Sequence, residues 1–471
     1  MKRKMKLAVF AFASAALLVS CVKDNGVVET SFQISAATED NKIVVTVEPS
    51  EASAVYSIGI IMGDDWNRIG GEQGLKAYAD SLIASGTETV SGQGIGRYED
   101  LYWQTKYYVF AAQVNDGHVV GTPEYKEANI YRPYVEFDAG DLVIAPASVS
   151  DNGMYIVGNY YDGIYRNSYI YDVRRDSLSL VSGISLYDVT DDGTAYGSSG
   201  FYPVIWKGGE VSEVRSVGSV MESGFYGVTP DGSVAVGYMM DDNWKNIGFV
   251  YENGTLTVLT AHGLDNGVCD GFAPKGIGSN GNISGYIQNS EPWAEVGCAW
   301  TGASHDFEIY PEDLMEWDSG LLDGSGAFGK RYGTVEARIS PDGRYYAGTV
   351  TVTESWEYMP DFPYLYDAQE GRMYEISGDA YQFWRADAVS SSGLLFLSDV
   401  NMGISSQPYI YSPADGKVIT MAEWAKAEYG YEPDGFRIQG SVVAVSGDCM
   451  TIVGDYAGDN SFVTAVWFMP M

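Results

Sequence analysis

The stretch VTPDG at residues 228–232 recurs as ISPDG at 339–343 and VTDDG at 189–193. Looser copies follow the same pattern of an aliphatic residue, a small residue and a Gly turn: VSDNG (149–153), IGSNG (277–281), VSSSG (389–393) and VAVSGD (443–448). An apolar strand follows each copy, and most copies lie roughly 40–50 residues apart, as in the blades of β-propellers. We therefore expect an all-β chain in which residues 134–471 form a seven-bladed β-propeller.

The acids of the repeated phrase allow two interpretations. Carboxylates and turn carbonyls are calcium ligands, but a tight turn between two strands also needs Gly at positive φ and a side chain that caps it. Ser392 replaces the acid in one copy, where a ligand role is hard to sustain. The pattern favours turns over metal ligands, and we predict no metal and no cofactor.

The end of the chain predicts how the ring closes. The last copy stops at Ala465-Val466-Trp467, which is the third strand of its unit, with four residues after it. Tyr134–Asp138 has a strand-like pattern but no unit of its own. We expect this segment to supply the missing fourth strand, because closure removes an exposed sheet edge.

Residues 29–133 lack the repeated phrase and alternate as strands do in a β-sandwich. Leu101 to Ala111 resembles the strand of fibronectin type III domains in which a tyrosine hydroxyl bonds back to the chain, although Trp103 or Gln104 replaces the usual proline. The resemblance implies a fibronectin-III/immunoglobulin-like domain that acts as a spacer. The remaining elements that we expect are strands at Thr30–Ser35, Lys42–Glu48 and Ala54–Met62 and a helix at Gly74–Ile83.

The first residues have the pattern of a bacterial lipoprotein signal. Lys2, Arg3, Lys4 and Lys6 precede a short apolar run, and Leu18-Val19-Ser20-Cys21 matches the site at which a diacylated cysteine becomes the new N-terminus. We expect residues 1–20 to be removed, Cys21 to carry lipid, and residues 21–28 to form a tether. Acyl chains on Cys21 would be the contact with the membrane.

The repeats also resemble the bacterial extracellular repeats of the HAF family. Glu336 to Gly343 with Gly348 fits that pattern, as does the stretch from Met421 to Trp467. The resemblance covers about 330 residues, implies an extracellular propeller of undefined ligand, and transfers no catalytic residue. Together with a lipidation site and a fibronectin-like domain, it is similar to Bacteroidetes surface lipoproteins. It implies an outer-membrane lipoprotein exposed at the cell surface.

Composition excludes several classes of function. The chain has a formal net charge of −35, and removal of the basic signal would make it more acidic, so nucleic acid is not an expected partner. Its three histidines, His118, His262 and His305, are dispersed, which argues against a zinc site or a Ser-His-Asp triad. No GxSxG occurs. We assign no catalytic residue, although some pair of the many carboxylates could lie at a glycosidase spacing.

Three cysteines besides Cys21 leave two interpretations open. Cys269 and Cys298 could form a bridge within one unit, whereas Cys449 has no obvious partner. The alternative is that all three are small buried hydrophobic residues.

The loops between second and third strands, and between units, are long and aromatic. Binding is one explanation, because aromatic rings beside Asp and Asn suit sugars; burial of the rings under the loops is the other. Met421–Glu428 is expected to be a helix, with Trp424 and Trp384 packed in the core. The candidate ligand-binding residues are Tyr160, Tyr161, Trp244, Trp293, Trp317, Trp356 and Tyr358.

These patterns favour a non-enzymatic, surface-anchored binding protein whose ligand is a glycan or a protein. An enzyme, either a polysaccharide lyase or a glycosidase with its site in the loop face or the central channel, is one alternative. A structural partner in an outer-membrane assembly is another.

Overall fold

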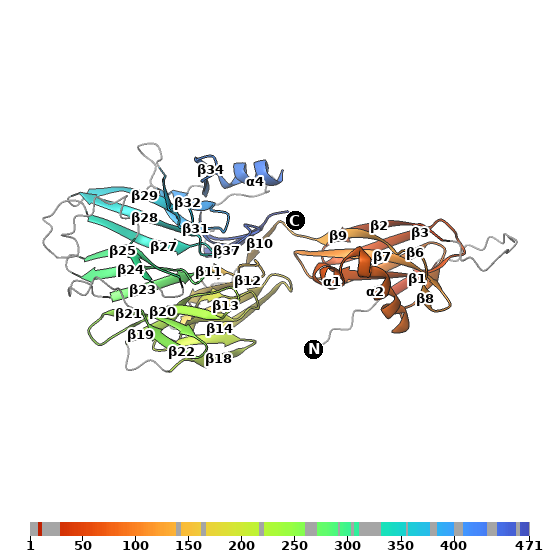
Figure 1. Ribbon diagram of the computed structural model, residues 1–471, viewed down its shortest axis with the longest axis horizontal. Coiled ribbons are helices and arrows are strands. Elements are labelled where there is room, and N and C mark those ends of the chain that lie inside the picture. The colour runs from red at the N-terminus through yellow and green to blue at the C-terminus, as the bar shows by residue number, and fades with distance from the viewer. Residues whose placement is uncertain are drawn as a thin grey trace. The chain divides into compact units, whose positions relative to one another are not determined.

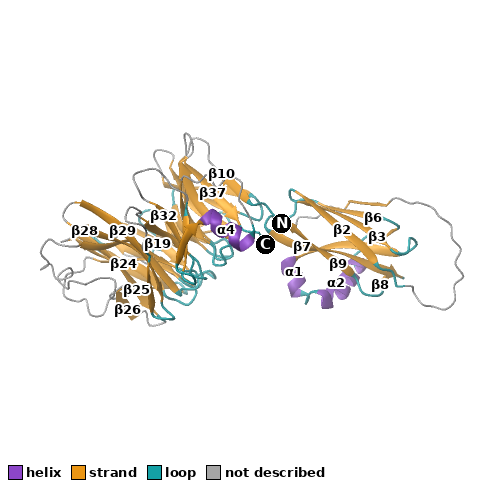
Figure 2. Ribbon diagram, turned by 90° about the horizontal axis from the view of Figure 1, so that it is seen from above, coloured by secondary structure: helices purple, strands orange, loops and turns teal. Residues whose placement is uncertain are grey.

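The computed structural model describes most of the chain as β-strand (Figures 1 and 2). The described residues are 8–11, 29–137, 143–161, 166–215, 221–259, 271–290, 293–302, 306–309, 331–354, 357–376, 384–399, 408–430, 440–457 and 462–470. Contacts divide the chain into unit 1, Met1–Arg132 with Met471, and unit 2, Pro133–Pro470. Each unit is described by itself.

Unit 1 contains two antiparallel sheets. The first has the order β1 (Ala8–Ala11), β6 (Gly94–Tyr98), β3 (Lys42–Pro49), β2 (Phe32–Glu39). The second has the order β5 (Val90–Ser91), β4 (Val55–Met62), β7 (Thr105–Asn115), β8 (His118–Val119), with β9 (Glu124–Ile130) also pairing with β7. Between β4 and β5 lie α1 (Gly63–Arg68) and α2 (Glu72–Ala84), so the expected helix is confirmed.

The two sheets of unit 1 share one hydrophobic cluster. Val45 of β3 is fully buried with Ile58 of β4 and Val109 of β7, as the alternation of apolar residues along these strands requires. Tyr107, which is 5% exposed, accepts a hydrogen bond at its hydroxyl from the backbone N–H of Tyr102 (2.8 Å). This is the tyrosine-to-backbone bond expected from the sequence around residues 101–111.

Unit 2 is a β-propeller of four-stranded antiparallel sheets, of which seven lie in the described residues. They follow the chain order in Figure 1. Sheet 1 is β11 (Val143–Val149), β12 (Tyr155–Tyr161), β13 (Arg166–Asp172) and β14 (Ser177–Ser182). Sheet 2 is β15 (Ser185–Val189), β16 (Ala195–Ser198), β17 (Pro203–Lys207) and β18 (Glu210–Glu213). Sheet 3 is β19 (Glu222–Val228), β20 (Val234–Met240), β21 (Asn246–Glu252) and β22 (Thr255–Val258).

The other sheets repeat this order. Sheet 4 is β23 (Gly271–Ile277), β24 (Ile283–Ser290), β25 (Trp293–Thr301) and β26 (Asp306–Ile309). Sheet 5 is β27 (Arg331–Ile339), β28 (Tyr345–Glu354), β29 (Glu357–Asp367) and β30 (Arg372–Glu375). Sheet 6 is β31 (Trp384–Val389), β32 (Leu395–Asp399), β33 (Tyr409–Ser412) and β34 (Lys417–Thr420). Sheet 7 is β35 (Gly440–Val445), β36 (Thr451–Ala457), β37 (Phe462–Phe468) and β10 (Tyr134–Phe137).

The fourth strand of sheet 7 comes from the start of the unit. Tyr134 pairs with Trp467, and Phe137 pairs with Thr464, in antiparallel register. Figure 1 shows β10 beside β37. The predicted pairing of Tyr134–Asp138 with the last strand is confirmed for residues 134–137, while Asp138 lies outside the described residues.

The core of unit 2 lies between neighbouring sheets. Sheets 6 and 7, for example, share a cluster with Phe396 of β32 and Trp467 of β37, and sheets 3 and 4 share one with Val236 and Trp300. Between sheets 7 and 1, the hydroxyls of Tyr169 and Thr464 lie 3.0 Å apart. Packing of this kind buries both faces of each sheet, which explains its mostly apolar strands.

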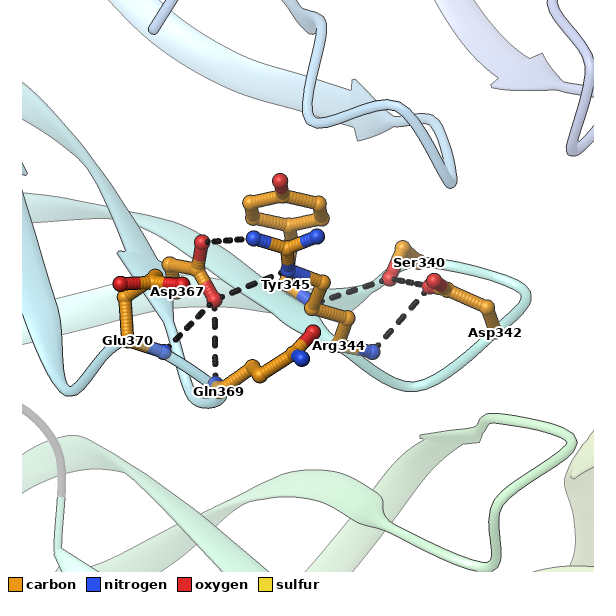
Figure 3. Close-up of polar contacts among 7 residues, drawn as sticks. All are labelled: Ser340, Asp342, Arg344, Tyr345, Asp367, Gln369 and Glu370. Atoms are coloured by element: carbon orange, nitrogen blue, oxygen red, sulfur yellow. Dashed lines mark hydrogen bonds and ion pairs between the residues drawn. The ribbon is translucent and has the colours of Figure 1, made fainter.

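The repeated phrase forms the turn between first and second strands, as predicted. In sheet 5, Ser340 Oγ accepts from the backbone N–H of Tyr345 (2.9 Å) and donates to Asp342 Oδ1 (2.5 Å) (Figure 3). Gly343 has φ +76°, which other residues adopt only with strain. The acid thus caps a turn, and the same hydroxyl-to-side-chain bond recurs at Ser150–Asn152, Thr190–Asp192, Thr229–Asp231, Ser390–Ser392 and Ser446–Asp448.

Hydrogen bonds also join neighbouring turns around the ring. The N–H of Asp191 donates to the carbonyl of Pro230 (2.9 Å), and the N–H of Ser279 donates to the carbonyl of Pro341 (2.8 Å). The seventh turn reaches the first through the N–H of Gly447 and the carbonyl of Asp151 (3.1 Å). Pro230 and Pro341 have no N–H, so they accept these bonds and cannot donate one onward.

The helix expected after β34 is present. α4 (Met421–Tyr429) begins at a capping box, because Thr420 Oγ1 accepts from the N–H of Glu423 while the Glu423 carboxylate accepts from the N–H of Thr420. Trp424 of α4 and Trp384 of β31 are 7% and 5% exposed, so the prediction that both are core residues is confirmed.

Candidate functional site

A cavity of about 170 Å³ lies at the centre of unit 2. Each of the seven sheets contributes its first strand to the wall, near the end at which that strand enters its Gly turn. This is the central channel of the propeller. The side chains that give the wall its polar character are Ser148, Asp151, Tyr187, Asp188, Tyr226, Lys275, Ser284, Arg338 and Asp387.

Every first strand of these seven sheets shifts register against its second strand shortly before the turn. The extra residues are Ala147, Tyr187, Tyr226, Lys275, Val335 with Glu336, Asp387 and Val443. Such a bulge leaves one residue unpaired and redirects its side chain, a device that is frequent beside binding sites. All but Val335 and Glu336, whose side chains are not described, line the cavity.

One side of the cavity is a cluster of tyrosines around a lysine. Tyr226 is stacked between Tyr187 and Tyr238, with ring centroids 4.7 and 4.6 Å away. Lys275 Nζ lies 4.4 Å from the Tyr226 ring centre, 5.0 Å from that of Tyr238 and 5.3 Å from that of Tyr286. These distances are within the range of cation–π attraction, which holds the ammonium group beside the rings. Burial and the neighbouring tyrosines raise the pKa of Tyr226, so its hydroxyl stays protonated.

Asp188 joins three neighbouring sheets. Its carboxylate accepts from the Ser148 hydroxyl of sheet 1 (2.6 Å), from its neighbour Val189 N–H (2.9 Å) and from the Val228 N–H of sheet 3 (2.8 Å). Burial nevertheless raises the pKa of Asp188 to about 6, because desolvation outweighs these bonds. Its hydrogen-bond set is that of a structural tie between sheets.

Asp387 is the second carboxylate of the cavity and is 2% exposed. Arg385 Nε donates to Asp387 Oδ1 (2.9 Å). Burial raises the pKa of Asp387 to about 6, against the opposing effects of Arg385 and Arg338. The two carboxylates therefore differ: Asp188 is held by three donors, whereas one oxygen of Asp387 carries the ion pair.

The candidate residues from the sequence are mostly outside this cavity. Trp244 is 67% exposed and has φ +66°, in a turn held by hydrogen bonds from the backbone N–H groups of Asn243 and Lys245 to Asp241 Oδ1. Tyr160 is 8% exposed, so it packs inside sheet 1 and offers no open ring. Trp317 and Trp356 lie outside the described residues, and the side chains of Tyr161, Trp293 and Tyr358 are not described. The structure therefore does not bring this set together.

The central residues were missed for an identifiable reason. The seven copies of the phrase were compared for what they share, whereas the residue three positions before the Ser or Thr differs among them: Ala147, Tyr187, Tyr226, Lys275, Ala337, Asp387 and Val443. At six of these seven positions that residue is in the bulge. Variation at one fixed position of the repeat is the sequence signal that could have found the site.

Other predicted features have partial outcomes. Cys298 and Cys449 are buried, 3% and 2% exposed, and burial raises the pKa of the Cys449 thiol to about 11. Cys269 and Cys21 lie outside the described residues. Within the described ranges, no group of three or more His, Cys, Asp or Glu is placed to hold a metal ion. No helix in the same ranges is long and apolar enough to cross a membrane.

No family model and no curated protein matches this sequence. Among solved structures, an oligogalacturonate lyase in complex with manganese aligns at 11% identity and TM-score 0.46, over 72% of this chain and 93% of its own. The oligogalacturonate lyase of Vibrio parahaemolyticus aligns at 9% identity and TM-score 0.45, over 72% and 97%. The β-propeller domain of the trilobed protease from Pyrococcus furiosus aligns at 10% identity and TM-score 0.37, over 83% and 97%. The chain thus has β-propeller proteins as structural neighbours, and no residue role transfers from them.

Proposed function

We propose that this protein is a lipid-anchored, cell-surface binding protein that holds a small polar ligand in the channel of its propeller. The observation that carries the proposal is the bulge in all seven first strands, which presents different side chains at one level of the channel. A repeat built only for stability has no need of Tyr, Lys and Asp at that position. The combination of tyrosine rings, a cation and a carboxylate is that of a recognition site.

The finer architecture belongs to this proposal. Each four-stranded sheet of unit 2 is one blade of a closed seven-bladed ring, supported by the pairing of β10 with β37 and by the Tyr169–Thr464 contact. Unit 1 is a fibronectin-III-like sandwich, supported by its strand order and by the Tyr107 bond. The resemblance of the repeats to the HAF family fits the same picture.

The anchor and the location rest on the sequence alone. Cys21 is the lipidated residue, residues 1–20 are removed, and the protein sits in the outer membrane facing outward. Cys21→Ala is expected to move the protein from the detergent phase to the aqueous phase on Triton X-114 partitioning. Retention of the variant in the detergent phase would exclude lipidation as the anchor. β1 lies within the segment that processing would remove.

A glycan is the ligand class that we favour, because aromatic rings beside hydrogen-bonding groups suit sugar rings. An array of monosaccharides and oligosaccharides, probed with residues 22–471, tests the proposal. Ala147→Phe places a ring in the cavity from a bulge position with a small native side chain. We expect it to abolish binding of every channel ligand while the melting temperature changes little. Phe201→Ala, at a side chain 61% exposed, is the matched control.

The result against a channel site would be equal binding by Ala147→Phe and the native chain. If binding instead fell with Trp244→Ala, the loop face with Trp293, Trp317, Trp356 and Tyr358 would be the site. That outcome would keep a binding protein but move its ligand to the face predicted from the sequence.

An enzyme is the second candidate, and one observation favours it. Asp188 and Asp387 line the same cavity with pKa values raised to about 6, which suits proton transfer near neutral pH. A polysaccharide lyase or glycosidase would release unsaturated products or reducing ends from a panel of polysaccharides. Product formation that Asp387→Asn abolishes would establish catalysis and displace the binding-only function.

A further inference from the structure

Two buried polar atoms on the cavity wall have no hydrogen-bond partner among the described residues. They are Ser284 Oγ and Asp387 Oδ2, on side chains that belong to residues 1% and 2% exposed. Leaving such an atom unsatisfied costs about 1–3 kcal/mol, so native proteins rarely keep one without a purpose. Both residues line the channel cavity, where water or a ligand can meet them.

The small residues around Ser284 keep its hydroxyl accessible. Gly276 pairs with Ser284 across β23 and β24, and a Cβ on Gly276 would lie 3.2 Å from Ser284 Oγ and 2.8 Å from Ile339. A larger side chain at residue 276 would therefore crowd the hydroxyl. The cavity beside it holds a ligand of about one sugar ring, since 170 Å³ is below the roughly 300–1,000 Å³ of pockets for drug-sized molecules.

The same wall carries two cations. Lys275 lies next to Gly276 at the bulge of β23, and Arg338 lies on β27 of the next sheet. The carboxylates of the cavity are already stabilised by protein groups: Asp188 by three donors and Asp387 by Arg385. An incoming cation would find these carboxylates compensated and would meet Lys275 at the tyrosine cluster, whereas an anion meets Lys275 and Arg338.

We propose that the channel selects a hydroxylated carboxylic acid of the size of one sugar ring. Its carboxylate binds Lys275 and Arg338, while ring hydroxyls donate to Asp387 Oδ2 and bond with Ser284 Oγ. This inference rests on the proposed channel-binding function and adds the charge class of its ligand. Tyr187, stacked on Tyr226, forms the aromatic wall beside the sugar.

Three probes that share one ring and differ in charge test the selectivity. Calorimetry on residues 22–471 with D-glucuronate, D-glucose and D-glucosamine is expected to give at least tenfold tighter binding of glucuronate than of either other sugar. Equal binding of glucose, tighter binding of glucosamine, or no binding of glucuronate would each overturn the assignment. This comparison uses the native chain, so it does not depend on whether any variant folds.

Substitutions at Lys275 then locate the charge. Lys275→Met keeps the length of the side chain and is expected to remove the preference for glucuronate over glucose. Lys275→Arg keeps the positive charge and is expected to retain it. An unchanged preference in Lys275→Met, with the native melting temperature, would show that the anion binds elsewhere.

Ser284→Ala separates recognition from structure. Because Ser284 Oγ has no protein partner among the described residues, its removal should leave the melting temperature of the unliganded protein unchanged or raise it, while glucuronate affinity falls severalfold. A structural hydroxyl would give the reverse, a lower melting temperature with native affinity, and would overturn its assignment to the ligand.

The two levels of the proposal fail in different ways. If a neutral sugar binds as tightly as glucuronate and Ala147→Phe abolishes both, the channel function stands and the acid selectivity falls. If no ligand from the array responds to Ala147→Phe, the channel function itself falls.

Discussion

The Gly turns and the bulges of unit 2 lie only three residues apart in each repeat, yet they behave in opposite ways. At the turns, six of the seven sheets place a Ser or Thr hydroxyl against the side chain two residues later. At the bulges, the side chains differ from sheet to sheet and include Tyr226, Lys275 and Asp387. The same backbone device therefore carries uniform chemistry in one row and varied chemistry in the other.

The difference teaches where a repeat protein keeps its function. Every turn must solve one problem, which is to reverse the chain and meet the next turn, so its residues converge. The bulge row has no such shared task, because each side chain points to the common channel from a different direction. Departures from the repeat therefore mark the site more clearly than the repeat does.

The uniform rows stabilise the protein only within a closed ring, and removing β10 tests this. A fragment starting at Leu142 lacks the partner of Trp467 and leaves β37 as an exposed edge. Compared with a fragment starting at Pro133, we expect aggregation, or a melting temperature lower by on the order of 5–10 °C, for a loss of about 3 kcal/mol. Identical cooperative melting of the two fragments would contradict ring closure as a source of stability.

Gly278 is the one departure within the turn row, and restoring the pattern should harm the protein. A Cβ at residue 278 would lie 2.2 Å from the Cα and 2.3 Å from the N of Gly343 in the neighbouring turn, so no hydroxyl residue fits. We expect Gly278→Ser to cost about 1–3 kcal/mol of unfolding free energy in urea titrations. Ser279→Ala, at the exposed adjacent residue, should be neutral; a stable Gly278→Ser would mean that the departure is incidental.

A hydroxyl inside the turn row should affect stability but leave ligand binding unchanged. Ser340→Ala removes the acceptor of the Tyr345 N–H and the donor to Asp342, at a residue that is fully buried. The expected loss is about 1–2 kcal/mol of unfolding free energy, with native affinity for any channel ligand. A loss of affinity larger than the loss of stability would break the separation between turns and channel.

The carboxylates of the channel should make stability fall with rising pH. Burial raises the pKa values of Asp188 and Asp387 to about 6, above the unfolded value near 4, so the folded state binds more protons between these limits. Their contribution is complete below pH 4 and is lost as pH rises through 6. Carboxyl ¹³C NMR on aspartate-labelled protein should show two titrations near pH 6, and ordinary values for both would refute the desolvation.

The smallest effect is expected at Trp244, far out on the β20–β21 turn. Its ring is 67% exposed, so Trp244→Ala should change the unfolding free energy by less than about 0.5 kcal/mol. Trp244→Gly should stabilise the protein by up to about 1 kcal/mol, because φ +66° suits glycine. A large loss of stability in Trp244→Ala would show that this ring packs against residues outside the described ranges.

The sequence by itself determined the features that depend on local chemistry. The repeated phrase predicted the turns, because Gly at positive φ and a capping side chain are local requirements. The spare strand at residues 134–138 and the unit that ends at Trp467 predicted their own pairing, because an open edge is unfavourable wherever it lies. The buried positions of Trp384 and Trp424 followed from the helix pattern of residues 421–428.

Only the tertiary structure decided which residues meet in the channel. Lys275, Arg338 and Asp387 lie on three sheets and up to 112 residues apart in the chain, so no local pattern joins them. A bulge is invisible to strand periodicity, because one inserted residue shifts the side chains that follow to the opposite face. The chemistry of the site therefore depends on a register shift repeated in seven strands, and that shift becomes apparent once the strands are paired.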